Sequence, residues 1–162
     1  MFCRVLTDGV GADWPLSRKF GCAPEMAIEV LEHAHRSGLE ATGVSFHVGS
    51  QQADLDAWDR ALAMAGAVFR TLAERGIQLR MVNLGGGFPA KYLKKIPVVQ
   101  TYGMAISSAL RKHFGNRLPE TIIEPGRGMV GDAGIIKAEV VLISRKEADD
   151  PLRWVYLDIG KF

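Results

Sequence analysis

Along the chain, short apolar runs alternate with longer segments in which apolar residues recur at helical spacing. The clearest segment follows Asp54, where six apolar residues recur at alternating intervals of three and four: Leu55, Trp58, Leu62, Ala65, Phe69 and Leu72. This spacing places all six on one face of a helix. Asp54 is suited to cap the start of that helix, and Gly76 is suited to end it.

Two more helices are predicted by the same periodicity. One begins at Pro24, a residue favoured in the first helical turn, and runs to about Ser37 before Gly38. The other covers about residues 98–114 and stops at Gly115. Their apolar faces comprise Ile28, Leu31 and Ala34–His35 in the first and Tyr102, Ile106, Ala109–Leu110 and His113 in the second.

Four apolar runs are the predicted strands between these helices. They cover residues 2–6, 41–47, 79–84 and 121–124. Alternation of strand and helix indicates a parallel α/β sheet, either doubly wound or part of a barrel. Beyond it the helical period disappears, and residues 134–144 and 153–159 are β-rich on either side of a charged turn at 146–150.

Composition and charge narrow the class of protein. Of the 162 residues, 48% are hydrophobic and 23% charged, which is typical of a globular protein and excludes a fibre or a disordered tail. A net charge of +2 gives no electrostatic reason to expect nucleic acid or an anionic membrane as a partner. The chain shows no apolar run of membrane-spanning length and no signal peptide. Cys3 and Cys22 lack metal-ligand spacing and are expected to be free thiols, so we expect a cytoplasmic protein without a metal.

Polar and glycine-rich clusters follow three of the predicted strands, at the strand ends where parallel α/β folds bind ligands. The first contains His47, which could stack on a flat ligand, move a proton or bind a metal, or could simply be a buried, hydrogen-bonded histidine. Gly49 and Ser50 form a small segment with a hydroxyl that suits a phosphate group.

The second and third clusters add backbone donors and charge. Gly85, Gly86 and Gly87 could direct successive N–H groups at one anion, or could form only a tight turn. Glu124 stands beside Arg127, which is either a salt bridge or a carboxylate for a protonated ring nitrogen with a cation for a phosphate. A phosphate, a flat ring and a ring nitrogen together describe pyridoxal 5′-phosphate.

The same clusters carry a specific family resemblance. Ser-Phe-His-Val-Gly-Ser at 45–50, Asn-Leu-Gly-Gly-Gly-Phe-Pro at 83–89 and Glu-Pro-Gly-Arg at 124–127 resemble, in order, motifs of the ornithine/diaminopimelate/arginine decarboxylases. Residues 16–21 and 156–160 resemble the family's segments before a barrel helix and at the return into the C-terminal β domain. These are alanine-racemase-like (fold type III) pyridoxal-phosphate enzymes, and the motifs are nearest to the ornithine and lysine decarboxylases.

The resemblance implies a role for each matching residue. His47 would stack on the pyridine ring, and Glu124 would pair with the pyridine nitrogen. The phosphate would be held by Ser50, by the N–H groups of Gly85, Gly86 and Gly87, and by Gly126 and Arg127.

The resemblance also implies a larger protein. A (β/α)8 barrel needs roughly 250 residues, so we expect this α/β chain to be an internal fragment. Residues 1–130 would be the second half of a TIM-type (β/α)8 barrel that binds pyridoxal phosphate, and residues 131–162 the beginning of a C-terminal β domain. None of the eight lysines matches the family's Schiff-base lysine, so we expect the chain alone to be inactive. The parent would be a homodimer.

Three functions remain open at this point. The first is decarboxylation of an amino-acid substrate, L-ornithine or lysine, to putrescine or cadaverine and CO₂ in polyamine biosynthesis. The second is a non-catalytic, decarboxylase-like regulatory protein that binds a partner. The third is a (β/α) enzyme whose glycine loops hold a sugar phosphate.

Overall fold

The computed structural model describes residues 1–16 and 19–160 of the chain. Ser17 and Arg18, which belong to the 16–21 motif, lie outside the described residues. The chain divides into two compact units, Met1–Asp132 and Ala133–Phe162. The first unit contains the elements that carry the candidate site, and each unit is described by itself below.

A four-stranded parallel sheet forms the centre of the first unit. Its strands are β1 (Phe2–Arg4), β3 (Gly43–Ser45), β5 (Met81–Asn83) and β6 (Glu120–Ile122), and they neighbour one another in this order. Each is shorter than the apolar run that predicted it, because the last residues of each run leave the ladder to enter a loop. Single hydrogen bonds continue the pairing there, as from Phe46 N–H to Asn83 O at 3.0 Å.

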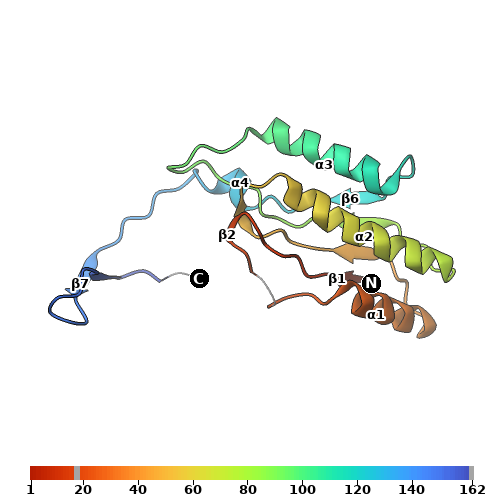
Figure 1. Ribbon diagram of the computed structural model, residues 1–162, viewed down its shortest axis with the longest axis horizontal. Coiled ribbons are helices and arrows are strands. Elements are labelled where there is room, and N and C mark those ends of the chain that lie inside the picture. Colours follow the sequence, from red (N-terminus) through yellow and green to blue (C-terminus); the bar gives the residue numbers. More distant parts are fainter. Residues whose placement is uncertain (17–18, 161–162) are drawn as a thin grey trace. The chain divides into compact units, whose positions relative to one another are not determined.

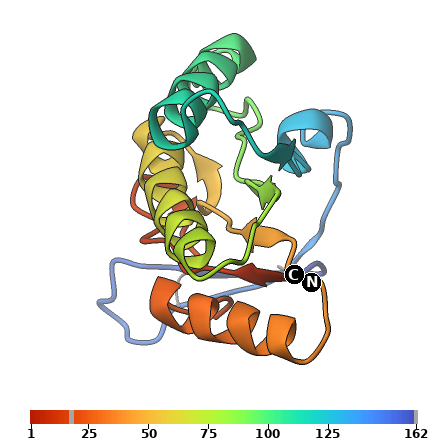
Figure 2. The same ribbon diagram turned by 90° about the vertical axis from the view of Figure 1, so that its right-hand side faces the viewer.

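Three helices pack along one face of this sheet, as Figures 1 and 2 show. They are α1 (Pro24–Arg36), α2 (Asp56–Glu74) and α3 (Val99–Phe114), each within two residues of its predicted start and end. Asp54 Oδ1 accepts a hydrogen bond from Asp56 N–H at 3.0 Å, so this carboxylate does serve the first turn of α2. Gly76 follows α2 with φ +82°, a left-handed conformation suited to glycine.

The sheet is a segment of a (β/α) barrel rather than a doubly wound sheet. Each new strand lies beside the one before it, and the helices between them lie on the same side of the curved sheet (Figure 2). A doubly wound sheet would reverse its strand order and carry helices on both faces. The predicted α/β fold class is confirmed.

The core lies between the sheet and the helices. From α2, the predicted apolar face contributes Trp58, Leu62, Ala65 and Leu72, all fully buried. The sheet contributes Val44 and Val82 from β3 and β5, together with Phe46 and Leu84 just beyond these strands, and α3 contributes Tyr102, Ile106, Ala109 and Leu110. Trp58 joins α2 to α3 and to the segment after the three glycines. Its ring centroid lies 5.5 Å from that of Tyr102 on α3 and 5.1 Å from that of Phe88.

Three elements of the first unit were not predicted. β2 (Ala12–Trp14) and β4 (Ser50–Gln52) form a short antiparallel pair, and α4 (Arg127–Val130) is a single helical turn. Ser50 is therefore the first residue of a strand and not part of a loop. These elements have only three or four residues, too few for a periodic pattern to identify them.

The second unit contains an antiparallel pair, β7 (Val140–Ser144) and β8 (Trp154–Leu157). The predicted β-rich region at 134–144 was too long, since residues 134–139 form no strand. The large apolar residues of both strands are exposed, Trp154 with 51% of its surface.

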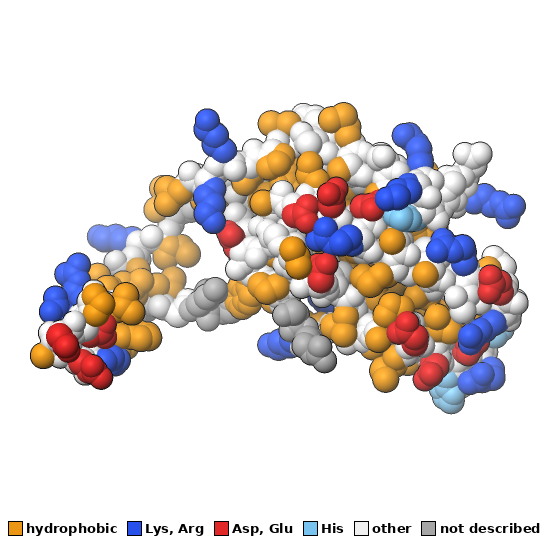
Figure 3. Space-filling view, in the orientation of Figure 1, with side chains coloured by type: hydrophobic (Ala, Val, Ile, Leu, Met, Phe, Trp, Pro, Cys, Tyr) orange, Lys and Arg blue, Asp and Glu red, His pale blue; other side chains and the backbone are white. Residues whose placement is uncertain are grey.

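The outer surface mixes both signs of charge. Figure 3 shows Lys and Arg side chains interspersed with Asp and Glu over the face it presents. Within residues 1–16 and 19–160, no helix is both long and apolar enough to cross a membrane.

Candidate functional site

Seven of the eight predicted site residues meet in one cavity at the carboxyl ends of β3, β5 and β6. The cavity measures about 110 Å³. Its lining comprises His47, Ser50, Gly86, Gly87, Glu124, Gly126 and Arg127, together with Gln51, Phe88 and Pro125. Gly85, the remaining predicted residue, does not line the cavity. Residues separated by up to eighty positions in the sequence thus converge because parallel strands end at the same edge of the sheet.

His47 follows β3 and has a defined tautomer. Gly49 N–H donates a hydrogen bond to His47 Nδ1 at 3.0 Å, so Nδ1 is an acceptor and the neutral ring carries its proton on Nε2. Burial, reinforced by the positive charge of Arg4 and opposed by Glu124, lowers the pKa of His47 below 6.5. The ring is therefore neutral at pH 7 and presents an uncharged face.

Glu124 lies two residues beyond β6, and its carboxylate is oriented from β5. Asn83 Nδ2 donates to Glu124 Oε1 at 2.8 Å. In addition, Glu124 N–H donates to Gly85 O at 2.8 Å, which ties the backbone after β6 to the glycine loop. Asn83 was part of a recognised motif, but its side chain had no predicted role.

The glycine loop has two N–H groups that could serve a ligand. Gly85 N–H donates to Asn83 Oδ1 at 2.8 Å, so it is committed within the protein. In the described part of the chain, no acceptor is found for Gly86 N–H or Gly87 N–H. Of the three glycines expected to contact a phosphate, only Gly86 and Gly87 therefore have an N–H group available for it among the described residues.

Close backbone approach also explains why this loop consists of glycine. A Cβ at Gly86 would lie 2.7 Å from Glu124 O and 3.1 Å from His47 Nε2. A Cβ at Gly87, where φ is +105°, would lie 2.5 Å from Gly49 O. The loop can therefore lie between the strand ends of β3 and β6 only without side chains.

Gln51 and Gln52 are structural residues of the site that sequence reasoning missed. Gln51 has φ +54°, unusual for a non-glycine residue, and its amide forms two bonds with the backbone of Ala90, at 2.7 and 3.1 Å. This pair attaches β4 to the segment that follows the glycine loop. Nothing in the sequence pattern distinguishes these glutamines from exposed ones.

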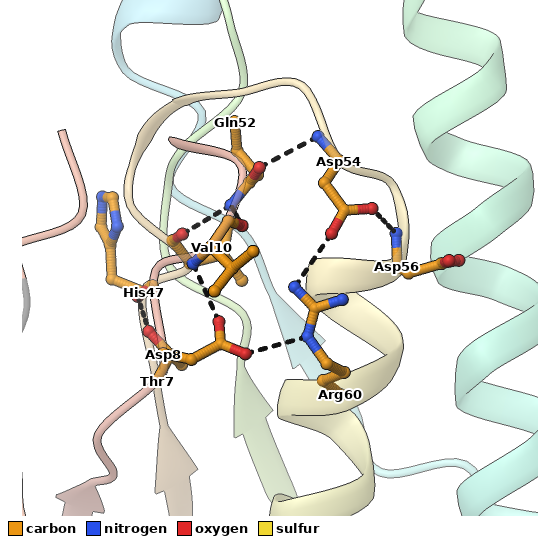
Figure 4. Close-up of polar contacts among 9 residues, drawn as sticks. Thr7, Asp8, Val10, His47, Gln52, Asp54, Asp56 and Arg60 are labelled. Atoms are coloured by element: carbon orange, nitrogen blue, oxygen red, sulfur yellow. Dashed lines mark hydrogen bonds and ion pairs between the residues drawn. The ribbon is translucent and has the colours of Figure 1, made fainter. Parts of the chain in front are cut away.

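Gln52 is completely buried and connects four segments. Its Nε2 donates to Val48 O at 2.8 Å and to Val10 O, and its Oε1 accepts from Asp54 N–H; Figure 4 shows the contacts with Val10 and Asp54. Its backbone N–H donates to Gly87 O at 2.9 Å, and its carbonyl accepts from Tyr102 Oη at 3.1 Å. Satisfied buried networks of this kind favour one arrangement of the loops.

An ion-pair network supports the same loops from outside. Arg60 on α2 contacts Asp8 Oδ2 at 3.0 Å and Asp54 Oδ2 at 2.9 Å, which joins the β1–β2 connection to the start of α2 (Figure 4). Because these side chains are partly exposed, the network orders the loops more than it stabilises the fold.

No lysine lines the cavity among the residues that the structure describes. Lys91, Lys94 and Lys95 follow the glycine loop and are exposed, and Lys94 Nζ lies 3.4 Å from Asp13 Oδ1. Ser50 Oγ and the Arg127 guanidinium form no bond or ion pair within residues 1–16 and 19–160. Both therefore remain available to an anion.

The donor set fits pyridoxal 5′-phosphate. An oriented carboxylate, a neutral aromatic ring, and a group of hydroxyl, N–H and guanidinium donors line one cavity. The loop between them is one that a Cβ would obstruct. A carboxylate beside the pyridine nitrogen is the expected protein contact of this cofactor.

Comparison with protein families decides between the possible phosphate ligands. Residues 1–131 match the family model described as pyridoxal-dependent decarboxylase, pyridoxal binding domain. The chain belongs to this family. The predicted cofactor and the predicted family are confirmed, and the sugar-phosphate alternative is set aside.

Several curated proteins resemble this pyridoxal-binding chain. It is 35% identical over 147 residues to the lysine/ornithine decarboxylase of Selenomonas ruminantium, covering 90% of this chain and 36% of the relative. It is 36% identical over 151 residues to the diaminopimelate decarboxylase of Staphylococcus aureus, covering 90% and 34%. It is also 35% identical over 150 residues to antizyme inhibitor 2 of Xenopus laevis, covering 92% and 32%.

A solved structure shows the same fold. The lysine/ornithine decarboxylase of Vibrio vulnificus, complexed with putrescine, superposes with a TM-score of 0.71 at 29% identity, covering 96% of this chain and 39% of that one. The pyridoxal-binding chain thus spans about a third of the length of its curated relatives.

Proposed function

We propose that this chain forms part of the cofactor-binding barrel of a basic amino-acid decarboxylase whose substrate is L-ornithine or lysine. In the proposed reaction the bond between the α-carbon and the carboxylate breaks, CO₂ leaves, and a proton takes its place. L-ornithine would yield putrescine, and lysine would yield cadaverine, in polyamine biosynthesis. The observation that carries the proposal is the convergence of Glu124, His47 and Ser50 on one cavity.

Each cavity residue has a role that its chemistry supports. Bound pyridoxal 5′-phosphate supplies an electron sink for the carbon that loses CO₂. Glu124, oriented by Asn83, would hold the proton of the pyridine nitrogen in place. The neutral ring of His47 would pack on the pyridine face. Ser50, Gly86, Gly87, Gly126 and Arg127 would bind the phosphate.

The substrate assignment rests on the relatives and the motifs. A lysine/ornithine decarboxylase is among the relatives, and a structure holding putrescine shares the fold. The diaminopimelate decarboxylase is equally similar in sequence, so overall identity does not distinguish the substrates. The choice of ornithine or lysine therefore rests on the motifs at 45–50 and 85–89, which resemble those of the ornithine and lysine decarboxylases. We propose that residues 133–160 begin a C-terminal β domain, that the complete protein is a homodimer, and that further parts of it complete the substrate site.

A binding measurement tests the proposed cofactor site. Isothermal titration of the 162-residue chain with pyridoxal 5′-phosphate should give a saturable site, and Glu124→Gln should weaken it about tenfold, the loss of one charge-assisted contact. Gly86→Ala should abolish it, because the added Cβ would meet Glu124 O at 2.7 Å. Gly103→Ala is the matched control, since a Cβ there meets no atom within 4 Å. Equal affinity in all three variants would refute the site.

A second candidate function is a non-catalytic regulatory protein. It is favoured by the similarity to antizyme inhibitor 2 and by a cavity whose described lining includes no lysine. Borohydride reduction of the chain with bound cofactor, followed by mass spectrometry, tests this second function. A cofactor covalently attached to one of its lysines, with CO₂ release from ornithine, would show that these 162 residues are catalytic by themselves.

We also propose that the protein works in the reducing cytoplasm. Cys3 and Cys22 are free, although their Sγ atoms lie only 3.7 Å apart. Burial and the neighbouring thiol raise the pKa of Cys3 to about 11, which keeps it protonated and unreactive at neutral pH. Thiol labelling of the protein from freshly lysed cells should find both cysteines reduced.

A further inference from the structure

We propose that Asn83 is a positioning residue, which sets the direction of the Glu124 carboxylate and holds the glycine loop against it. The proposal rests on the proposed function, because it concerns the carboxylate assigned to the pyridine nitrogen. It adds a residue whose side chain does not line the cavity and to which the motif assigned no role.

Asn83 has a backbone that cannot move independently. It is the last residue of β5, a central strand, and it pairs in register with Ser45 on one side and Ile122 on the other. Its carbonyl accepts the hydrogen bond from Phe46 N–H, and only 6% of its surface is exposed. The side chain therefore leaves from one of the most firmly placed points of the sheet.

The orientation of the Asn83 amide follows from its partners. Gly85 N–H can only donate, so the atom that it contacts at 2.8 Å must be the amide oxygen. The amide nitrogen then faces Glu124 Oε1, also at 2.8 Å. Both contacts are satisfied by one orientation, which fixes the side chain in the direction that presents a donor to the carboxylate.

Three hydrogen bonds close a ring among these residues. Gly85 N–H donates to the Asn83 amide, the Asn83 amide donates to the Glu124 carboxylate, and Glu124 N–H donates to Gly85 O. The ring joins the end of β5, the start of the glycine loop and the segment after β6. A change at Asn83 therefore reaches two parts of the cofactor site together.

Glu124 depends on this ring because little else restrains it. Glu124 is itself exposed, and it follows the exposed strand β6. In the described residues, Asn83 is the one partner of its carboxylate. Without the amide, the three side-chain torsions of a glutamate would be free to rotate, and this freedom would be lost again on binding the cofactor.

A double-mutant cycle on the 162-residue chain tests the proposal, with pyridoxal 5′-phosphate as the ligand and isothermal titration as the measurement. Asn83→Ala should weaken binding about tenfold in the otherwise unchanged chain. In the Glu124→Ala background the same change should weaken binding clearly less than tenfold, because no carboxylate is left to orient and only the bond from Gly85 N–H to the Asn83 amide is lost. An equal loss in both backgrounds, or no loss in either, would overturn the proposal.

A measurement without the cofactor distinguishes failure of this proposal from failure of the proposed function. In NMR spectra of the unliganded chain, the Asn83 side-chain amide signals should shift as acid protonates carboxylates, and Glu124→Gln should remove that shift. Absence of the shift in the unchanged chain would overturn the proposal, even if Asn83→Ala failed to fold. A chain that shows the shift but binds no pyridoxal 5′-phosphate would leave the Asn83–Glu124 coupling standing and refute the proposed function.

Discussion

The central strands and the last strand of the sheet are paired in the same way but are buried very differently. All residues of β3 and β5 are buried, whereas all three residues of β6 are exposed. Parallel hydrogen bonding is the same in both, with β6 joined to β5 in register. What differs is side-chain cover, because the central strands lie between two strands and beneath α2 while β6 has a partner on one side only.

This difference divides the candidate site. His47 and Asn83 belong to buried strand ends, while Glu124 and Arg127 follow the exposed strand. The buried half is held by core packing and the exposed half by individual hydrogen bonds. Cofactor affinity should therefore be sensitive to changes on both sides, but the stability of the fold should depend mainly on one.

The largest expected effect comes from the buried side. Trp58→Ala removes a completely buried ring that packs on Phe88 and Tyr102, and it should lower the free energy of unfolding by about 3–5 kcal/mol. Urea unfolding followed by far-ultraviolet circular dichroism measures it. Trp154→Ala in the second unit is the control, with an expected change within about 0.5 kcal/mol because that ring is half exposed. Comparable losses of unfolding free energy in both variants would contradict the conclusion that stability depends mainly on the buried side.

A matched aliphatic pair tests the strands directly. Val82→Ala on β5 removes two methyl groups that are fully buried and should cost about 2 kcal/mol. Ile123 follows β6, and 51% of its surface is exposed. Ile123→Ala should therefore lower the free energy of unfolding by less than about 1 kcal/mol. Urea unfolding of both variants gives the difference. A larger loss at Ile123 would mean that another segment or a partner covers β6 in solution.

The helical layer over the central strands should make stability depend on acid. Hydrogen bonding from Lys112, and from His113, keeps the pKa of Asp59 below its usual 3.8 despite partial burial. This contribution is fully present above about pH 4 and is lost as the pH falls through the lowered pKa, because the unfolded state then binds more protons. Asp59→Asn should flatten the acid limb of a plot of unfolding free energy against pH. An unchanged acid limb would show that the contact between α2 and α3 carries no such dependence.

His47 provides the smallest and most local test. Its pKa lies below 6.5 because of burial, so folding favours the neutral ring. The corresponding stability is complete above about pH 6.5 and declines as the pH falls, since the unfolded chain takes up the proton first. NMR titration of the His47 ring should give a midpoint below pH 6.5. A midpoint at or above pH 6.5 would contradict the effect of burial on this half-buried ring.

Much of the architecture could be predicted from residue pattern alone. The α2 helix has an unbroken apolar face of six residues, and its bounds were found within a residue or two. The short strand β4 could not be found, because three residues reading Ser-Gln-Gln have neither apolar alternation nor β-branched side chains. Its pairing with β2 arises from tertiary contacts such as those of Gln52.

The site shows the same limit. His47, Ser50 and Glu124 could be named because each is a chemically unusual residue at a predicted strand end. Gln51 and Asn83 could not, because their importance lies in which atoms their side chains meet: backbone atoms of Ala90 for Gln51 and a carboxylate oxygen of Glu124 for Asn83, each about forty positions away.

The sequence by itself determined the order of strands and helices, the glycine and polar clusters at the strand ends, and from them the cofactor and the family. Those properties are local, since they depend on side-chain periodicity and on residue type. Only the tertiary structure decided which glycine N–H groups remain available, why the loop admits no Cβ, and how Asn83 directs Glu124. Those properties depend on distances between strand ends, which exist only once the sheet has formed.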